Sequence, residues 1–150
     1  MCRFLLTITL VLALCYTGCS EDSDTPIAPP LDTVTLYTKD DTVIANAYIV
    51  RDAAEAFAAA NNGVYAALTT TALPNGDTMV LLLPGGALLT NPFSKVPDSP
   101  VDGTAGVAGQ VGYVSLDRDG DGFPDGYTID ALGENGVDYL IVIVKDPREP

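Results

Sequence analysis

Apolar positions between residues 42 and 62 recur at the period of an α-helix. One helical stripe collects Val43, Ala47, Val50, Ala54 and Phe57. Arg51, Asp52 and Glu55 lie on the opposite side of the same helix. Many of the remaining positions are alanines, which favour helix and leave little side-chain bulk, so a neighbouring layer can approach closely. The pattern predicts a helix over 42–62 that packs on a sheet.

Both ends of this predicted helix carry sequence signals. Asp41 is placed to be the N-cap, and Asn62-Gly63 favours a left-handed exit from the helix. Arg51 and Glu55 are spaced for an ion pair one turn apart. The preceding segment, 33–38, is rich in β-branched residues and fits either a short strand or an upstream extension of the helix.

The last forty residues change to a strand pattern. Val111–Leu116 alternates, Gly126–Leu132 follows it, and Tyr139–Lys145 is apolar and β-branched. Asn135-Gly136 is a favourable hairpin turn between the second and third of these segments. We expect an antiparallel meander whose one face covers the helix.

The middle of the chain is less regular. Pro74–Asp77 is a turn signal, and Thr78–Leu83 is a short apolar run that fits either a strand or a turn of helix. Residues 84–109 are dense in Pro, Gly and Ser and predict a long irregular connection. The predicted fold class is therefore α+β, with a long N-terminal helix packed on a small antiparallel sheet of about three strands.

The first forty residues have the layout of an exported protein. Residues 1–18 hold Arg3 and a short apolar run, which is shorter than the roughly 20 residues that span a bilayer, so a signal peptide is favoured over a membrane helix. Thr17-Gly18-Cys19 is similar to the lipobox of bacterial lipoproteins, in which the cysteine carries the lipid. Tyr16 stands where those proteins usually have leucine, and an ordinary signal peptide cleaved near Gly18 or Ser20 is the alternative.

These signals divide the chain into three parts. Residues 1–18 are a lipoprotein-type signal peptide, 19–40 hold the lipidated Cys19 and an acidic, proline-containing tether, and 41–150 form the globular domain. We expect an exported protein anchored by lipid to the bacterial envelope, and Ser20, by similarity to Gram-negative lipoproteins, indicates the outer membrane.

Composition narrows the functions to consider. The net charge is −13, there is no histidine or tryptophan, and the cysteines are Cys2, Cys15 and Cys19. The charge disfavours nucleic acid as a partner and favours cations. Without histidine, and with every cysteine in the first twenty residues, the domain lacks the usual general bases and thiolate sites. We expect no enzymatic activity and no small-molecule substrate.

The connection between the first two predicted strands is acidic. Its aspartates follow the pattern D-x-D-x-D-G-x-x-D at Asp117, Asp119, Asp121 and Asp125, with Phe123 where a backbone carbonyl would bind. Alternating carboxylates around a glycine turn suit Ca²⁺, and the spacing matches the first nine positions of an EF-hand loop. The twelfth position is Thr128 instead of glutamate, which argues against a true EF-hand. The alternative is a solvated acidic loop without an ion.

The order of features from residue 42 to 142 resembles the globular head of type IV pilin-like proteins, particularly the major pseudopilin of type II secretion. The resemblance is carried by the segments 53–67 (AAEAFAAANNGVYAA), 81–103 (LLLPGGALLTNPFSKVPDSPVDG), 109–113 (GQVGY) and 125–136 (DGYTIDALGENG). It implies a pilin-like α+β head whose sheet-side loop binds calcium, here through Asp117, Asp119, Asp121 and Asp125. Pilin precursors also carry a Gly-Phe cleavage site and a hydrophobic assembly helix, and this sequence has Cys19 and an acidic tether in that place.

Three functions follow from these observations. The first is a non-enzymatic, lipid-anchored, calcium-stabilised structural or accessory protein that serves a type II secretion system or a type IV pilus. The second is a free-standing surface binding module that holds a ligand or protein partner through the loop 84–109. The third, a hydrolase using Asp117, Asp119 or Asp121, is disfavoured by the missing histidine and cysteine.

Overall fold

The computed structural model describes residues 38–146, all of which belong to the compact unit 36–150. Their elements, in chain order, are α1 Lys39–Ala60, the 3-10 turns η1 Val80–Leu82 and η2 Pro84–Gly86, and the strands β1 Leu89–Thr90, β2 Pro97–Ser99, β3 Val101–Asp102, β4 Val111–Leu116, β5 Gly126–Leu132 and β6 Tyr139–Lys145. The last three strands coincide with the three strands predicted from the sequence. Strands β1, β2 and β3 lie in the segment predicted to be irregular.

Helix α1 begins three residues earlier than predicted. Thr38, and not Asp41, is the N-cap, and the two residues form a capping box. The Thr38 hydroxyl accepts from the Asp41 amide at 3.1 Å, and the Asp41 carboxylate accepts from the Thr38 amide at 2.8 Å. The bond from the Thr38 amide, followed by one from the Thr38 hydroxyl to the same carboxylate at 2.8 Å, lowers the pKa of Asp41. Because the helix starts at Lys39, the last two residues of the predicted tether, 39–40, belong to the helix.

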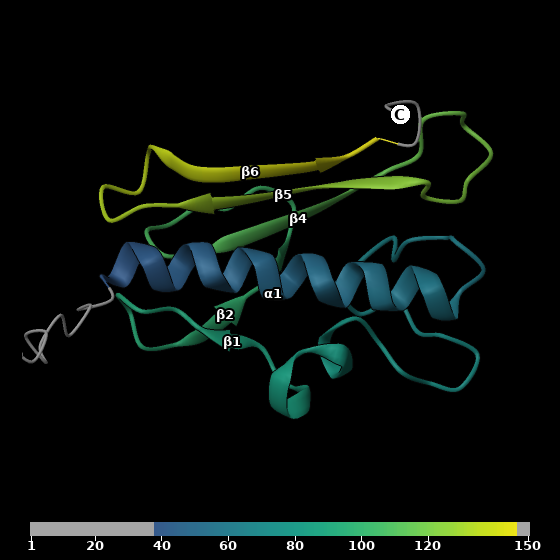
Figure 1. Ribbon diagram of the computed structural model, residues 1–150, viewed down its shortest axis with the longest axis horizontal. Coiled ribbons are helices and arrows are strands. Elements are labelled where there is room, and N and C mark those ends of the chain that lie inside the picture. The colour runs from purple at the N-terminus through teal and green to yellow at the C-terminus, as the bar shows by residue number, and fades with distance from the viewer. Residues whose placement is uncertain (1–37, 147–150) are drawn as a thin grey trace, which may run out of the picture. The chain divides into compact units, whose positions relative to one another are not determined.

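Two sheets contain the strands (Figure 1). The larger has the order β3-β4-β5-β6, in which β3 and β4 are parallel and the other neighbours are antiparallel. Strands β1 and β2 form the smaller, antiparallel sheet. Figure 1 shows α1 between the larger sheet and the part of the chain that holds β1, β2 and the 3-10 turns. The side-chain amide of Asn46 in α1 donates to the Thr90 carbonyl of β1 at 3.3 Å.

The predicted fold class is therefore wrong. Residues 38–146 contain one helix of 22 residues and six strands in two sheets, and not a long N-terminal helix on a sheet of about three strands. Strands β1, β2 and β3 have only two or three residues each. Segments that short carry no readable alternation, and their pairing depends on contacts with distant parts of the chain.

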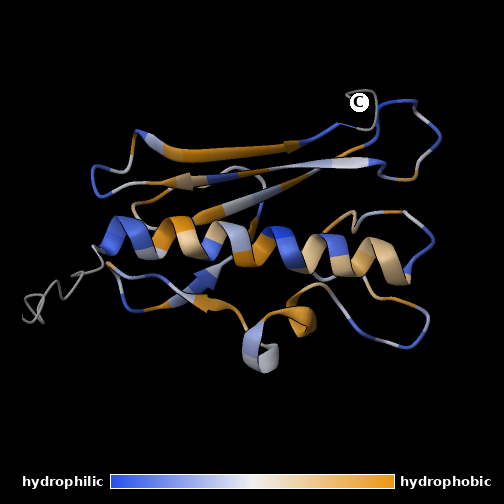
Figure 2. Ribbon diagram, in the orientation of Figure 1, coloured by the Kyte–Doolittle hydropathy of each residue, from blue (hydrophilic) through white to orange (hydrophobic). Residues whose placement is uncertain are grey.

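The core lies between α1 and the inner face of the larger sheet. The helix contributes its predicted stripe, Val43, Ala47, Val50, Ala54 and Phe57, and each of these residues is fully buried. The inner face of the sheet contributes Val111, Tyr113, Tyr127, Ile129 and Ala131. Orange segments along α1 and β4 in Figure 2 follow this layer. Burial of these side chains is the main stabilising term that positions the sheet and its loops.

Glu55 joins the helix to the sheet through two tyrosines. Its carboxylate accepts from the Tyr127 hydroxyl at 2.8 Å and from the Tyr65 hydroxyl at 3.1 Å. The rings of Tyr65 and Tyr127 meet edge to face, with centroids 5.1 Å apart. The predicted Arg51–Glu55 ion pair is wrong, because Arg51 instead pairs with Asp52 at 2.7 Å. Burial, followed by the bond to Glu55, raises the pKa of Tyr65 to about 12 and raises the pKa of Tyr127 further.

Buried polar side chains order the segment 84–109. Asn91 is fully buried, donates to the Ala108 carbonyl at 2.8 Å and accepts from the Phe93 amide at 2.9 Å. Asp130 of β5, also buried, accepts from the Ala105 amide at 2.8 Å. A side chain at Gly112 would collide with the Asp130 carboxylate and the backbone of this segment. Asn91 thus ties two parts of the long connection to each other, and Asp130 fixes the connection to β5 at Ala105.

Several predictions fall on residues 1–37, outside the described part of the chain. They are the signal peptide 1–18, lipidation at Cys19, most of the tether 19–40, and the strand or helix extension at 33–37. Within residues 38–146, no helix combines the length and the apolar character that crossing a membrane requires.

Candidate metal centre

The acidic loop connects β4 to β5, the two central strands of the larger sheet. Asp117 follows directly after β4, and both of its carboxylate oxygens accept backbone amides, from Gly120 at 2.8 Å and from Gly122 at 2.9 Å. Gly120 and Gly122 have φ values of 77° and 89°, a conformation that other residues rarely adopt. The glycines therefore let the loop curl around the Asp117 carboxylate.

The other aspartates organise the loop in the same way. Asp119 accepts from the Asp121 amide at 3.2 Å, and Asp121 accepts from the Phe123 amide at 2.8 Å. Asp125 accepts from the Arg118 amide at 3.3 Å. Each carboxylate oxygen keeps a further lone pair after accepting one such bond. The amides thus hold the carboxylates in place without using up their capacity to bind a cation.

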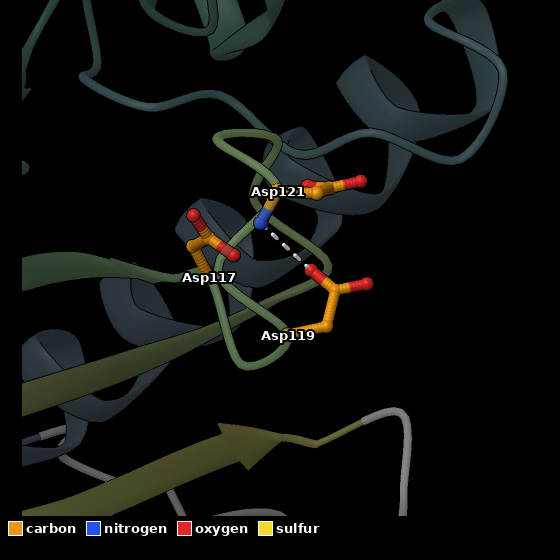
Figure 3. A group of neighbouring side chains, drawn as sticks. All are labelled: Asp117, Asp119 and Asp121. Atoms are coloured by element: carbon orange, nitrogen blue, oxygen red, sulfur yellow. Dashed lines mark hydrogen bonds between the residues drawn. The ribbon is translucent and has the colours of Figure 1, made fainter.

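Three of the predicted ligands come together. Asp117, Asp119 and Asp121 each offer one carboxylate oxygen, and these oxygens lie within 4.8 Å of one another. All three side chains are exposed. Figure 3 shows them around a single turn of the loop, with the hydrogen bond from the Asp121 amide to Asp119 dashed. These residues form a group that could hold a metal ion.

The remaining predicted ligands are placed differently. Asp125 lies at the end of the loop, where its amide donates to the Leu116 carbonyl at 2.9 Å and closes the loop at its base. The Asp125 carboxylate is not a member of the group of three. The Phe123 side chain is 61% exposed, and its amide is committed to Asp121. Coordination by Asp125 and by the Phe123 carbonyl stays a prediction.

The donor set fits a hard cation. Three carboxylates at this separation repel one another, and an ion among them would replace that repulsion with attraction. Oxygen ligands suit Ca²⁺ and Mg²⁺, whereas Zn²⁺ sites in proteins are usually built from Cys and His. The exposure of the loop leaves space for water molecules to complete the coordination.

Hydrogen bonds and an ion pair fasten the loop to its surroundings. The Tyr65 amide, five residues after α1, donates to the Pro124 carbonyl at 2.9 Å. Arg118 and Asp146 form an ion pair at 3.6 Å. Nearby, the Tyr113 hydroxyl donates to the Ala66 carbonyl at 2.8 Å. The loop therefore ties β4 and β5 to the chain that leaves the end of α1.

A second acidic group was not anticipated from the sequence. Asp40, at the start of α1, accepts from the Glu134 amide at 3.2 Å and lies with Asp138 beside the β5–β6 turn. The Asn135-Gly136 turn marked the hairpin, but nothing in the sequence places residue 40 next to residue 134. That proximity arises from the packing of α1 across the sheet.

Comparisons with known proteins add no assignment. The chain matches no protein-family model, no curated protein and no solved structure.

Proposed function

We propose that this protein is a non-enzymatic structural or accessory protein of the bacterial cell envelope, stabilised by Ca²⁺ in the loop 117–125. One observation carries the calcium part, namely the three aspartate oxygens within 4.8 Å in the loop between the central strands. The bound ion stabilises the loop. The loop in turn connects the core strands β4 and β5 and is hydrogen-bonded to the chain that follows α1. Bound calcium neutralises the repulsion among Asp117, Asp119 and Asp121.

Calcium fits the proposed role better than magnesium. Ca²⁺ accepts six to eight oxygen ligands in flexible geometry, and Mg²⁺ demands a near-ideal octahedron. An exposed loop that offers three carboxylates supplies irregular, adaptable coordination. In the proposed site, Asp125, the Phe123 carbonyl and water complete the ligand set.

Calorimetric titration of the purified chain with CaCl₂ and with MgCl₂ tests the site. We expect one Ca²⁺ per chain, an affinity between about micromolar and millimolar, and weaker Mg²⁺ binding. Asp119→Asn should weaken Ca²⁺ binding at least about tenfold, because one charge is lost while the amide oxygen can still accept from Asp121. Glu134→Gln is the matched control and should bind like the wild type. Absence of Ca²⁺ binding, or equal binding by Asp119→Asn, would contradict the proposal.

The envelope location is proposed from the signal-like segment and Cys19. Metabolic labelling with palmitate should mark the wild-type chain and a Cys15→Ser variant, and Cys19→Ser should lose the label. If Cys19→Ser kept the label, the lipid would be attached at another residue, and lipidation at Cys19 would be contradicted.

The role in a secretion or pilus apparatus is proposed from the resemblance of the four segments to pseudopilin heads. Chemical cross-linking in cells of the native host, followed by mass spectrometry, tests it. We expect cross-links to components of a type II secretion system or a type IV pilus. Cross-links confined to other proteins would favour a free-standing binding module.

A further inference from the structure

Among residues 38–146, no strand pairs with the outer side of β6, which is an open edge of the larger sheet. It has seven residues, pairs with β5 on one side, and is last in the strand order (Figure 1). An open edge presents unpaired backbone N–H and C=O groups that can bond to another strand. The opposite edge is the two-residue β3, which offers far less pairing length.

The hydrogen bonds of Leu132 show which backbone groups of this edge are open. Its amide donates to the Gln110 carbonyl at 3.1 Å, and its carbonyl accepts from the Gly109 amide at 2.9 Å. Both backbone groups of Leu132 thus point away from β6. Successive residues of a strand direct these groups to opposite sides, so the neighbouring Ala131 directs its own toward β6.

The same alternation fixes the orientation of β6. Ile129, two residues before Ala131, directs its backbone groups toward β6, where its partner is Ile143. Val142 and Val144, on either side of Ile143, therefore direct their N–H and C=O groups outward, away from β5. These two valines mark the stretch of the edge where an added strand would form hydrogen bonds.

Few of the usual protective devices are present along this stretch. Natural sheets blunt open edges with proline, charges, β-bulges or short strands. The pairing of β5 with β6 shifts register between Ala131 and Leu132, at the start of β6, and is regular along the stretch of Val142 and Val144. Strand β6 contains no proline, and its one charged residue is Lys145 at its end. The side chains of Val142 and Val144 are each 52% exposed. Figure 2 shows β6 as a largely hydrophobic strand at the margin of the sheet.

A small acidic hollow adjoins the start of β6. It has a volume of about 400 Å³ and is lined by Asp40, Gly133, Glu134, Asn135, Asp138 and Leu140. Three acidic residues thus line the hollow together with Leu140 of β6. This combination suits the side chain of arginine or lysine, whose stem packs on leucine while its cationic group meets the carboxylates.

We propose that the β6 edge and this hollow together bind an extended segment of a partner protein. The segment adds a strand beside β6, packs apolar side chains near Val142 and Val144, and places a basic residue in the hollow. Backbone hydrogen bonds supply affinity in this mode of recognition, and side-chain sites supply specificity. The basic residue is specified by the carboxylates of Asp40, Glu134 and Asp138.

Synthetic peptides test the proposal directly. The first probe alternates valine and threonine over the length of β6, with an arginine at each end. A second carries glutamate at both ends, and a third keeps the arginines but has proline at its centre. With the purified full chain, fluorescence anisotropy should show saturable binding of the first peptide and at least tenfold weaker binding of the other two. Equal binding of the glutamate peptide would overturn the role of the hollow.

Variants of the protein test the edge and the hollow separately. Val142→Pro removes one outward N–H without removing a bond to β5, and should weaken binding of the arginine peptide at least tenfold. Val142→Thr keeps that N–H and loses only apolar contact, so it should bind the arginine peptide more tightly than Val142→Pro. Glu134→Gln should weaken binding of the arginine peptide by about two- to fivefold. If Val142→Pro does not fold, the peptide with proline at its centre still tests pairing at the β6 edge. The proposal would be overturned if that peptide bound as tightly as the first peptide.

Amide hydrogen exchange in the free chain checks that the edge is available. We expect fast exchange at Val142 and Val144 and slow exchange at Ile143, with protection of both valines when the arginine peptide is added. The proposal would be overturned if both valine amides were protected in the free chain. It would also be overturned if sedimentation showed a dimer that Val142→Pro abolishes, because either result would mean that the edge is already covered.

Discussion

At the scale of single residues, Glu55 is the clearest link between helix and sheet. Its carboxylate holds the hydroxyls of Tyr65 and Tyr127, which come from the chain after α1 and from β5. A hydrogen bond to a charged acceptor is stronger than one between neutral groups. The cluster therefore fixes how α1 lies across the sheet.

Removing the Tyr127 hydroxyl measures how much its hydrogen bond to Glu55 contributes to stability. Tyr127→Phe should lower the free energy of unfolding by about 1 kcal/mol, because Tyr127 is buried and its hydroxyl bonds Glu55 at 2.8 Å. Tyr139→Phe is the matched control, since Tyr139 is 51% exposed, and should change stability by less than about 0.5 kcal/mol. Urea denaturation followed by circular dichroism gives both values. Equal effects of the two substitutions would show that the Glu55 bond adds nothing.

The same tyrosines predict a loss of stability in alkali. The pKa of Tyr65 rises from 10.0 to about 12, and the pKa values of Tyr113 and Tyr127 are also raised, in each case chiefly by burial. A group with a raised pKa in the folded state stabilises fully below its unfolded pKa and loses that contribution as the pH rises. The melting temperature should therefore fall between pH 10 and 12. A melting temperature that stays level through this range would contradict the burial of these hydroxyls.

At the scale of elements, the capping box sets where α1 begins. Thr38→Ala removes the side-chain acceptor of the Asp41 amide and should cost about 1 kcal/mol of stability. Thr38→Ser keeps a hydroxyl, so its free energy of unfolding should be close to that of the wild type. Denaturant unfolding of the three proteins measures the difference. If alanine and serine are equivalent, the cap is not formed in solution.

Sequence patterns predicted the long elements and missed the short ones. Alternation in β4, apolar and β-branched content in β6 and the turn residues between the strands placed β4, β5 and β6 correctly, because segments of six or seven residues are long enough to carry these signals. Asp41 was predicted to be the N-cap, whereas the structure has Thr38 as the N-cap and Asp41 at the third helical position of a capping box. The spacing Thr38-x-x-Asp41 is that of a capping box and was the local signal that could have identified the true start of α1.

The remaining differences have long-range causes. Arg51 and Glu55 were correctly spaced for an ion pair, but Glu55 instead binds two tyrosine hydroxyls, one of them 72 residues away in sequence. The order in segment 84–109 depends on Asn91 and Asp130, whose partners lie 17 and 25 residues away. Three of the four aspartates in the candidate site were grouped correctly because they lie within one tight loop.

At the scale of the whole molecule, the acidic loop joins parts of the chain that are distant in sequence. It connects the central strands β4 and β5, bonds Tyr65 after α1, and reaches Asp146 through Arg118. The chain carries a net charge of −13, so repulsion within this loop adds to repulsion across the molecule. A bound cation at Asp117, Asp119 and Asp121 would therefore stabilise the entire domain and not the loop alone.

Thermal unfolding in calcium and in chelator tests this account most directly. A ligand that binds only the folded state at 100 times its dissociation constant adds about 2.7 kcal/mol. We predict that saturating Ca²⁺ raises the melting temperature by on the order of 10 °C over EDTA, and that Asp119→Asn loses most of this rise while Glu134→Gln keeps it. Identical melting temperatures of the wild type in calcium and in EDTA would contradict the proposed stabilising ion.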